Sequence, residues 1–303
     1  MRVTLIHNQG AGDAEQPGRD ELLTLLSSAG HEVKYQSSKE GNWQTVLEEP
    51  ADLVAVAGGD GTVGKVARQL IGRRTLLTIL PLGTANNISN ALGIAGPAGQ
   101  LINGWSAARR VKFDVGVASG PWGDTVFVEG IGAGLYTRTM SRLNARDNLQ
   151  LAHLNSAAEK LSDVLRMLRD ELRDYPARRL EAELDGQDIT GEYLLLEAMN
   201  IKYIGPGLRL APDADPGDGQ LDFVLVAESE RQRLAAHFNE RARGKKKPLR
   251  LTARRGQHLR LQWHGFEIHI DDDVWPGIGS PIPTAPLVID VRVDKHALEF
   301  LVP

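Results

Sequence analysis

The chain has 303 residues, of which 24% are charged and 42% hydrophobic, a composition typical of folded globular proteins rather than of disordered or fibrous ones. Its net charge of −4 provides no overall positive field for nucleic acid, and the absence of cysteine excludes disulfides and thiolate metal sites. No apolar run approaches the roughly 18 residues of a membrane span, and MRVTLIHNQG lacks the pattern of a secretory signal, so we expect a cytoplasmic protein.

The first part of the chain alternates short apolar runs with amphipathic segments. Strands are predicted at 2–7, 31–36, 53–57 and 76–80, and each is followed by a helical pattern. Strands that alternate with helices at this spacing form parallel sheets with right-handed crossovers. The sequence therefore predicts an α/β domain, which we place at residues 1–115.

Three of these strands end in turns that are rich in glycine or asparagine, at 8–12, 58–61 and 83–87. In open parallel sheets, ligands bind beyond the carboxyl ends of the strands. The central turn, GGDG, joins a strand to a helix, and the unpaired N–H groups of a helix N-terminus suit a phosphate. Asp60 would repel that phosphate unless it holds Mg²⁺ or accepts a proton from a substrate hydroxyl. A phosphotransferase is one interpretation, and a plain strand-to-helix turn is the other.

The pattern changes at 111–117, and the rest of the chain, 116–294, is predicted to be a β-rich second domain, a sandwich. Its expected strands are 125–131, 178–184, 192–199, 221–227, 249–254, 257–263, 266–270 and 286–292. An amphipathic helix is expected over 149–173, covering one face. The last residues, 295–303, either pair within this domain or return to the first. A basic cluster at 241–255 is either a solvated loop and strand edge or a contact for anionic lipid head groups.

Three motifs in order along the chain resemble those of the diacylglycerol kinase and sphingosine kinase catalytic family, which includes bacterial lipid kinases. They are GGDGT at 58–62, PLGTAN at 81–86 running into ALGI, and DGQLD at 218–222. The resemblance implies an α/β nucleotide-binding domain, a β-sandwich domain and an ATP site in the cleft between them. It also implies ATP-dependent transfer of the γ-phosphoryl group to a lipid hydroxyl, with Mg²⁺.

The resemblance also implies the site residues, position by position. The nucleotide-binding residues are Asn8, Gly12, Ser37, Gly58, Gly59, Asp60, Gly61, Thr62, Val63, Gly64, Thr84 and Asn86. A structural cation, Mg²⁺ or Ca²⁺, is implied at Asp218 with the main chain around Asp215 and Gln220. An Asp-Gly turn with solvated acids is the alternative for that loop.

The catalytic base implied by the resemblance is Asp271, which follows FEIHI, with Asp60 as a metal ligand or alternative base. The sequence departs from the family pattern here, since Asp272 replaces a glycine. It departs again at Gly64 and Lys65, where Asn-Glu is usual, and at Asn87, where aspartate is usual. Gln9 stands where proline is usual.

Two other functions remain open at this point. An NAD kinase would share GGDG, although the chain lacks a Gly-Ser-Thr-Ala-Tyr stretch. A nucleotide- or lipid-binding protein without turnover would explain Gly64, Lys65 and Asn87. The expected partners are ATP and a lipid substrate, with peripheral membrane contact and a homodimer left open and no nucleic acid.

Overall fold

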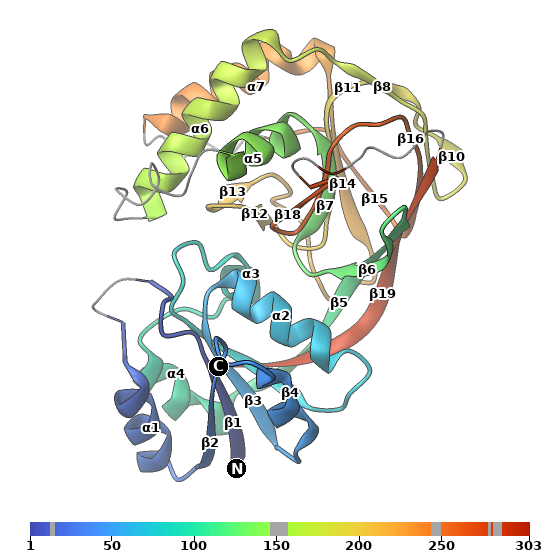
Figure 1. The fold of residues 1–303 in the computed structure, drawn as a ribbon. Coiled ribbons are helices and arrows are strands. Elements are labelled where there is room, and N and C mark those ends of the chain that lie inside the picture. The colour runs from blue at the N-terminus through green and yellow to red at the C-terminus, as the bar shows by residue number, and fades with distance from the viewer. Residues whose placement is uncertain (13–15, 146–156, 244–249, 278–279, 281–286) are drawn as a thin grey trace. The chain divides into compact units, whose positions relative to one another are not determined.

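The computed structural model describes residues 1–303 except 13–15, 146–156, 244–249, 278–279 and 281–286 (Figure 1). The chain forms two compact units. The first comprises Met1–Val115, Pro216–Asp218 and Lys295–Pro303, and the second comprises Gly116–Asp215 and Gly219–Asp294. No helix of the described residues is long and apolar enough to span a membrane.

The first unit is built on the predicted parallel sheet, with strand order β4-β3-β1-β2. The strands are β1 (Arg2–His7), β2 (Glu32–Ser37), β3 (Leu53–Gly58) and β4 (Leu76–Pro81). Every residue of β3 is buried, as expected for the central strand of a sheet that is covered on both faces. The C-terminal end of the long strand β19 (Leu287–Val302) runs parallel beside β4, where Phe300 pairs with Leu77.

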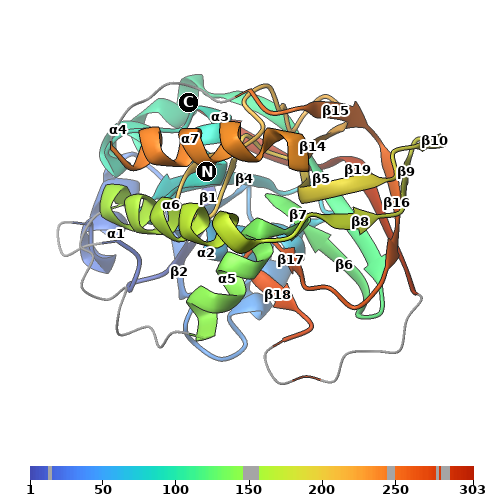
Figure 2. The same cartoon turned by 90° about the horizontal axis from the view of Figure 1, so that it is seen from above.

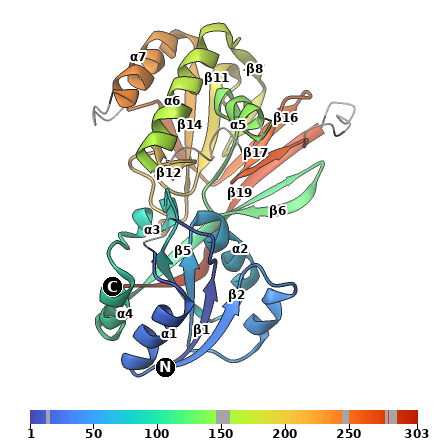
Figure 3. The ribbon, with the colours of Figure 1, turned by 60° about the vertical axis from the view of Figure 1, so that its left-hand side comes forward.

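Helices cover both faces of this sheet. Figure 3 shows α1 and α4 together on one face and α2 on the other. The helices are α1 (Arg19–Ser28), α2 (Asp60–Leu70), α3 (Asn87–Leu92) and α4 (Ala98–Gly104), with 3-10 turns η1 (Trp43–Glu48) and η2 (Trp105–Ala107). Within α2, Val63, Val66, Ala67 and Leu70 are buried, so the helical spacing seen in the sequence marks the face toward the sheet.

The second unit is a sandwich of two sheets with helices on one outer face. One sheet has the order β15-β14-β11-β7-β17-β18, with β8 beside β11. Its strands are β7 (Gly130–Gly134), β8 (Arg178–Leu180), β11 (Gly191–Met199), β14 (Leu221–Ala227), β15 (Ala253–Gly256), β17 (Ile268–Ile270) and β18 (Asp273–Trp275). The facing strands are β5 (Arg109–Gly120), β6 (Gly123–Phe127), β9 (Ala182–Leu184), β10 (Gln187–Asp188), β16 (His258–Trp263) and the first part of β19. A pair of short strands, β12 (Tyr203–Ile204) and β13 (Leu208–Arg209), stands apart.

Two hydrophobic cores hold this unit together. Phe127, Phe223, Leu261 and Trp263 belong to the core between the sheets. On the other face of the larger sheet, α5 (Leu135–Ala145), α6 (Ala157–Asp174) and α7 (Arg231–Ala242) form the second core. Helices α6 and α7 lie side by side in Figures 1 and 2. A short turn, η3 (Glu228–Glu230), leads into α7.

Several expected elements differ from those observed. The expected strand 125–131 divides at Val128 and Glu129 into β6 and β7, and the strand 178–184 divides at Glu181 into β8 and β9. Each half pairs with a different sheet of the sandwich, so one apolar run supplies two strands. Helices α4, α5 and α7 were not predicted, and the segment at 43–48 is a 3-10 turn. The predicted helix over 149–173 and the basic cluster at 241–255 lie partly outside the described residues.

Two segments from later in the chain, Pro216–Asp218 and Lys295–Pro303, also belong to the first unit. The prediction left residues 295–303 open between the two domains, and they group with the first unit, where Phe300 pairs with Leu77 of β4. The earlier part of β19, residues 287–292, pairs with β16 in the second unit. Residues 216–218, which the prediction placed in the second domain, group with the first unit, and within it the Asp114 amide donates a hydrogen bond to the Pro216 carbonyl.

Candidate functional site

The three turns at the carboxyl ends of β1, β3 and β4 meet in the first unit. Asn8 Nδ2 donates to Thr62 Oγ1 at 3.2 Å, which joins the first turn to the start of α2. A Cβ atom added to Gly59 would lie 3.0 Å from the Gly83 Cα atom, and one added to Gly12 would collide with the Leu82 carbonyl. These glycines are therefore required for the close approach of one loop to another.

Asp60 connects two of these loops. It is the first residue of α2, and its Oδ1 accepts a hydrogen bond of 2.9 Å from the Ile88 amide in the first turn of α3. Burial raises the pKa of the Asp60 carboxyl, and the main-chain N–H groups of Ile88, Asn87 and Asn86 act against that rise. The carboxylate thus caps α3 from outside that helix, an arrangement that fixes the GTAN loop against the GGDG loop.

Asn86 and Ser37 use their side chains within their own turns. Asn86 has φ +51°, its Oδ1 accepts from the Gly83 amide at 2.9 Å, and its Nδ2 donates to the Gly83 carbonyl at 2.7 Å. Ser37 is buried at the end of β2, where its Oγ accepts from the Lys39 amide at 3.3 Å. Thr84 is half-buried between Gly83 and Asn86. Asn86 and Ser37 shape the loops, and the direct nucleotide contacts predicted for Asn86, Ser37 and Thr84 stay predictions.

The other residues of the glycine-rich segment 58–64 lie at the end of β3 and in the first turns of α2. Gly58, Thr62, Val63 and Gly64 are buried, whereas Gly61 is exposed. A Cβ atom added to Gly64 would make only an ordinary contact, at 3.8 Å from the Arg68 Nη1 atom. Lys65, the neighbouring departure from the family pattern, is exposed.

Lys39 is a candidate that the sequence analysis missed. Its ammonium group lies over the first turn, because a Cβ atom added to Gly10 would be 2.5 Å from Lys39 Nζ. Lys39 is exposed and lies two residues beyond Ser37, the last residue of β2. The signal available in the sequence was a lysine just beyond the carboxyl end of a strand neighbouring β1, a position from which a cation reaches an anion at this edge.

Asp271 belongs to the second unit and is held by main-chain donors. Its carboxylate accepts from the amides of Val128 at 3.0 Å, Glu129 at 2.8 Å and Gly130 at 3.1 Å. Its own amide donates to the Gly130 carbonyl at 2.8 Å, and its φ is +49°. Asp271 therefore closes the turn after β17 onto the break between β6 and β7, while Asp272 and Asp273 beside it are exposed.

A buried acid and a buried base lie directly behind this turn. His269 Nε2 and Glu197 Oε2 are 2.6 Å apart with both side chains fully buried, and His269 Nδ1 lies 3.1 Å from the Asp271 carbonyl oxygen. Burial alone lowers the pKa of His269, but the Glu197 charge and hydrogen bond outweigh it and the pKa is raised. Strand β7 lies between the strands of this pair and must carry Gly132 at this position, because any Cβ atom there would overlap the Glu197 carboxylate. The sequence analysis missed this pair.

The predicted cation loop is acidic, as expected. Burial, followed by the charges of Asp213 and Asp215, raises the pKa of Asp222 to about 6. Among the described residues no three acidic, histidine or cysteine side chains group as a metal site. The ligand set expected from Asp218, with main-chain oxygens near Asp215 and Gln220, needs only one side chain, so it stays a prediction.

Comparison with known families agrees with this arrangement. The diacylglycerol kinase catalytic domain matches residues 2–118, and the YegS C-terminal NAD kinase beta sandwich-like domain matches residues 140–299. The chain belongs to the family of diacylglycerol kinases and YegS-like lipid kinases. The predicted fold class, an α/β domain with a parallel sheet and a β-sandwich second domain, is confirmed.

Relatives of this family match most of the chain. The diacylglycerol kinase of Mycobacterium tuberculosis H37Rv is 26% identical over 288 residues, which is 91% of this chain and 86% of the relative. A protein of Serratia proteamaculans named "Probable lipid kinase YegS-like" is 30% identical over 244 residues, 75% of this chain and 73% of the relative.

A solved structure shares the fold. A diacylglycerol kinase from Bacillus anthracis str. Sterne superposes with a TM-score of 0.69 at 21% identity, covering 100% of this chain and 97% of that chain.

Proposed function

We propose that this protein is a lipid kinase that transfers the γ-phosphoryl group of ATP to a lipid hydroxyl. The observation that carries the proposal is the meeting of three turns at one edge of the parallel sheet, joined by the Asn8–Thr62 and Asp60–Ile88 hydrogen bonds and by the Gly59–Gly83 packing. Loop amides and a helix N-terminus at such an edge suit the phosphates of a nucleotide. Membership of the lipid kinase family supports the same function.

The residues of the first unit fit a nucleotide triphosphate and one metal ion. Lys39 provides a cation over the first turn, and the start of α2 provides a positive dipole end. Asp60 is the carboxylate of these loops, and Mg²⁺ usually takes one or two protein carboxylates together with phosphate oxygens and water. ATP, when bound with Mg²⁺, supplies the phosphoryl group, and these side chains orient it.

The second unit supplies the proposed base. Asp271 is proposed to accept the proton of the lipid hydroxyl, with Asp60 remaining with the metal and phosphates. The three amide donors of residues 128–130 hold the Asp271 carboxylate in one orientation, and His269 holds its main-chain carbonyl. Exposed Asp272 and Asp273 are the rival carboxylates in the same turn.

The test is incubation of the purified protein with labelled ATP, Mg²⁺ and a total lipid extract. We expect label in the lipid fraction, and we expect Asp60→Asn to lower the rate on the order of a hundredfold. Label found only in water-soluble NAD would favour the NAD kinase alternative. No transfer to any acceptor, with Mg²⁺-ATP still bound, would favour a binding protein without turnover.

A further inference from the structure

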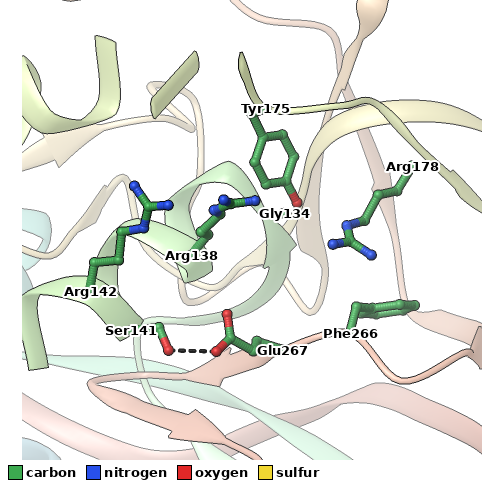
Figure 4. A pocket seen from close by; sticks show the side chains of 8 residues that line it. All are labelled: Gly134, Arg138, Ser141, Arg142, Tyr175, Arg178, Phe266 and Glu267. Atoms are coloured by element: carbon green, nitrogen blue, oxygen red, sulfur yellow. Dashed lines mark hydrogen bonds between the residues drawn. The ribbon is translucent and has the colours of Figure 1, made fainter. Parts of the chain in front are cut away.

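A cavity of about 330 Å³ in the second unit is lined by arginine side chains that the proposed phosphoryl transfer does not use (Figure 4). Its volume lies within the range of small-ligand sites. We call it the arginine pocket, and its lining residues are Gly134, Arg138, Ser141, Arg142, Tyr175, Arg178, Phe266 and Glu267. Arg138 and Arg142 come from α5, whereas Arg178 opens β8, so two separate segments bring the guanidinium groups to one cavity.

The arginine pocket lies away from the proposed base. Asp271 binds to Gly130 at the start of β7, whereas the pocket is at the end of β7, where Gly134 lines it. The neighbouring strand β17 runs antiparallel, so Glu267 precedes it at the pocket and Asp271 follows it at the other end. Four residue steps of a strand span roughly 13 Å. The pocket is thus a second site rather than a part of the first.

The charges around the pocket favour an anion. Arg138 Nε lies 3.4 Å from Glu171 Oε2, and Arg142 pairs with the other oxygen of the same carboxylate, which is 10% exposed. Glu267 is the second carboxylate and accepts from Ser141 Oγ at 2.6 Å. In the described part of the chain, three guanidinium groups therefore face two carboxylates here, which leaves one positive charge.

Hydrogen-bond donors are also in excess. Each guanidinium carries five N–H donors, and two of the three arginines share the single Glu171 carboxylate. The Arg138 guanidinium stacks 5.6 Å from the centroid of the Tyr175 ring, which fixes its plane. Burial raises the pKa of Tyr175, partly offset by Arg178, so its hydroxyl stays protonated. Planar guanidinium groups bind phosphate with paired, charge-assisted hydrogen bonds.

The Glu267 carboxylate discriminates between the anions that could bind in the arginine pocket. A carboxylate on the wall repels an anion that has only acceptors, such as sulfate, but accepts a hydrogen bond from an anion that keeps an O–H group. Hydrogen phosphate has such a group at neutral pH. We propose that the arginine pocket binds a phosphate group that carries an O–H, or lies beside a hydroxyl, supplied either as free phosphate or by a lipid head group.

The test measures the thermal stability of the full chain with inorganic phosphate, with sulfate, and with chloride at the same ionic strength. A ligand that binds only the folded state raises the melting temperature. We expect phosphate to raise it more than sulfate does, and Arg178→Gln to lower the phosphate affinity about tenfold, the loss expected for a charge-assisted pair. Arg166→Gln, an exposed arginine paired with Asp163 on α6 and outside the pocket, is the matched control and should leave the phosphate response unchanged.

Two further variants sharpen this test. Arg142→Gln should reduce the phosphate response as Arg178→Gln does, so the result does not depend on one variant folding well. Glu267→Gln removes the repelling charge, so sulfate should become as effective as phosphate. The proposal is overturned if phosphate does not raise the melting temperature of the wild-type protein. It is also overturned if both arginine variants keep the full rise in melting temperature, because phosphate would then be acting at the proposed nucleotide loops.

Vesicles distinguish the two sources of the phosphate. Sedimentation is compared with phosphatidylcholine vesicles with and without phosphatidylglycerol, whose head group carries a phosphate beside hydroxyls. If a lipid head group is the ligand, Arg178→Gln weakens binding to the anionic vesicles and free phosphate competes with them. If free phosphate is the ligand, Arg178→Gln loses the phosphate response without changing vesicle binding.

Discussion

At the scale of single residues, Asp271 has a role that its chemistry alone does not reveal. Three amides donate to its carboxylate, and a hydrogen bond to a charged group contributes about 1.5–3 kcal/mol. The residue is also in the left-handed region, which a short polar side chain tolerates when it bonds locally. Asp271 therefore anchors a turn as well as standing where the base is proposed.

Asp271→Asn separates these two roles. Asparagine keeps one oxygen that can accept from the amides of Val128, Glu129 and Gly130, but it loses the negative charge and the second oxygen that accepts from Val128. Because hydrogen bonds to a charged group are the stronger ones, we expect unfolding in urea to become easier by about 2 kcal/mol. We expect lipid phosphorylation to fall on the order of a hundredfold, measured at a temperature where the variant is folded. Asp272→Asn and Asp273→Asn are the controls, since both side chains are exposed and should alter stability little. Normal turnover in Asp271→Asn with loss in either control would move the base role to that neighbour.

Lys39 provides a second test at this scale. Removing its positive charge over the Gly10 turn should weaken the hold on nucleotide phosphates, and we expect Lys39→Gln to lower ATP affinity about tenfold. Lys34→Gln is the matched control, because Lys34 lies on β2, the strand that precedes Lys39, and pairs with Glu49. Calorimetric titration of both variants with Mg²⁺-ATP measures the effect. Equal affinities of the two variants would remove Lys39 from the site.

At the scale of elements, the parallel sheet could be predicted because β1, β3 and β4 are short apolar runs that end in turns rich in glycine or asparagine. The sandwich strands were harder, since the chain changes sheet at Glu129 and at Glu181 within segments that read as one apolar run, and no glycine or proline adjoins Glu181. Helix α7 was missed because its two buried large side chains, Leu234 and Phe238, make too narrow an apolar face to stand out. Most of its surface remains polar because it lies at the outside of the unit, beside α6.

In the candidate site, too, some features could be predicted from the local sequence, whereas others depend on contacts between residues far apart in the chain. The meeting of the three turns followed from the rule that parallel strands end at one edge. The partners of Asp271 are more than 140 residues earlier in the chain, and Glu197 is 72 residues from His269. No local pattern encodes such pairs, because they depend on the register of β7, β11 and β17.

Helix α7 carries a titratable group whose effect on stability can be measured. Burial, followed by repulsion from Arg241, lowers the pKa of His237 to about 4, while Glu240 acts in the opposite direction. The unfolded chain, with a pKa near 6.5, therefore binds a proton more readily than the folded one. The stability that His237 supports is present above pH 6.5 and is lost as the pH falls toward 4.

We therefore expect His237→Gln to reduce the loss of stability between pH 6.5 and pH 4. Urea midpoints of wild type and variant at several pH values measure the effect. His264→Gln, which changes an exposed histidine, is the control and should follow the wild-type curve. A wild-type pH dependence retained in His237→Gln would show that other groups are responsible.

At the scale of the whole molecule, neither unit is a single continuous stretch of chain. Strands β5 and β19 each contribute to both units, and buried Asp114 fixes them within the first, where its Oδ1 accepts from the His296 amide at 2.6 Å. Thr78 Oγ1 donates to the Leu301 carbonyl at 2.8 Å, so the end of the chain completes the sheet that carries the glycine-rich loops. The loop around Asp218 is the third passage of the chain between the units.

A cation at this loop would stabilise a stretch of the chain that carries several aspartates. Burial, followed by the charges of Asp213 and Asp215, raises the pKa of Asp222, and a divalent ion would offset the repulsion that those two charges exert on it. An ion that binds only the folded state raises the free energy of unfolding. We therefore expect Mg²⁺ or Ca²⁺ to raise the melting temperature of the wild type and to have little effect on Asp218→Ala. In chelator the two proteins should melt within about 2 °C of each other, a difference that corresponds to about one kcal/mol in a chain of this size. If Asp218→Ala is equally destabilised with and without chelator, Asp218 acts as a turn residue and the loop holds no ion.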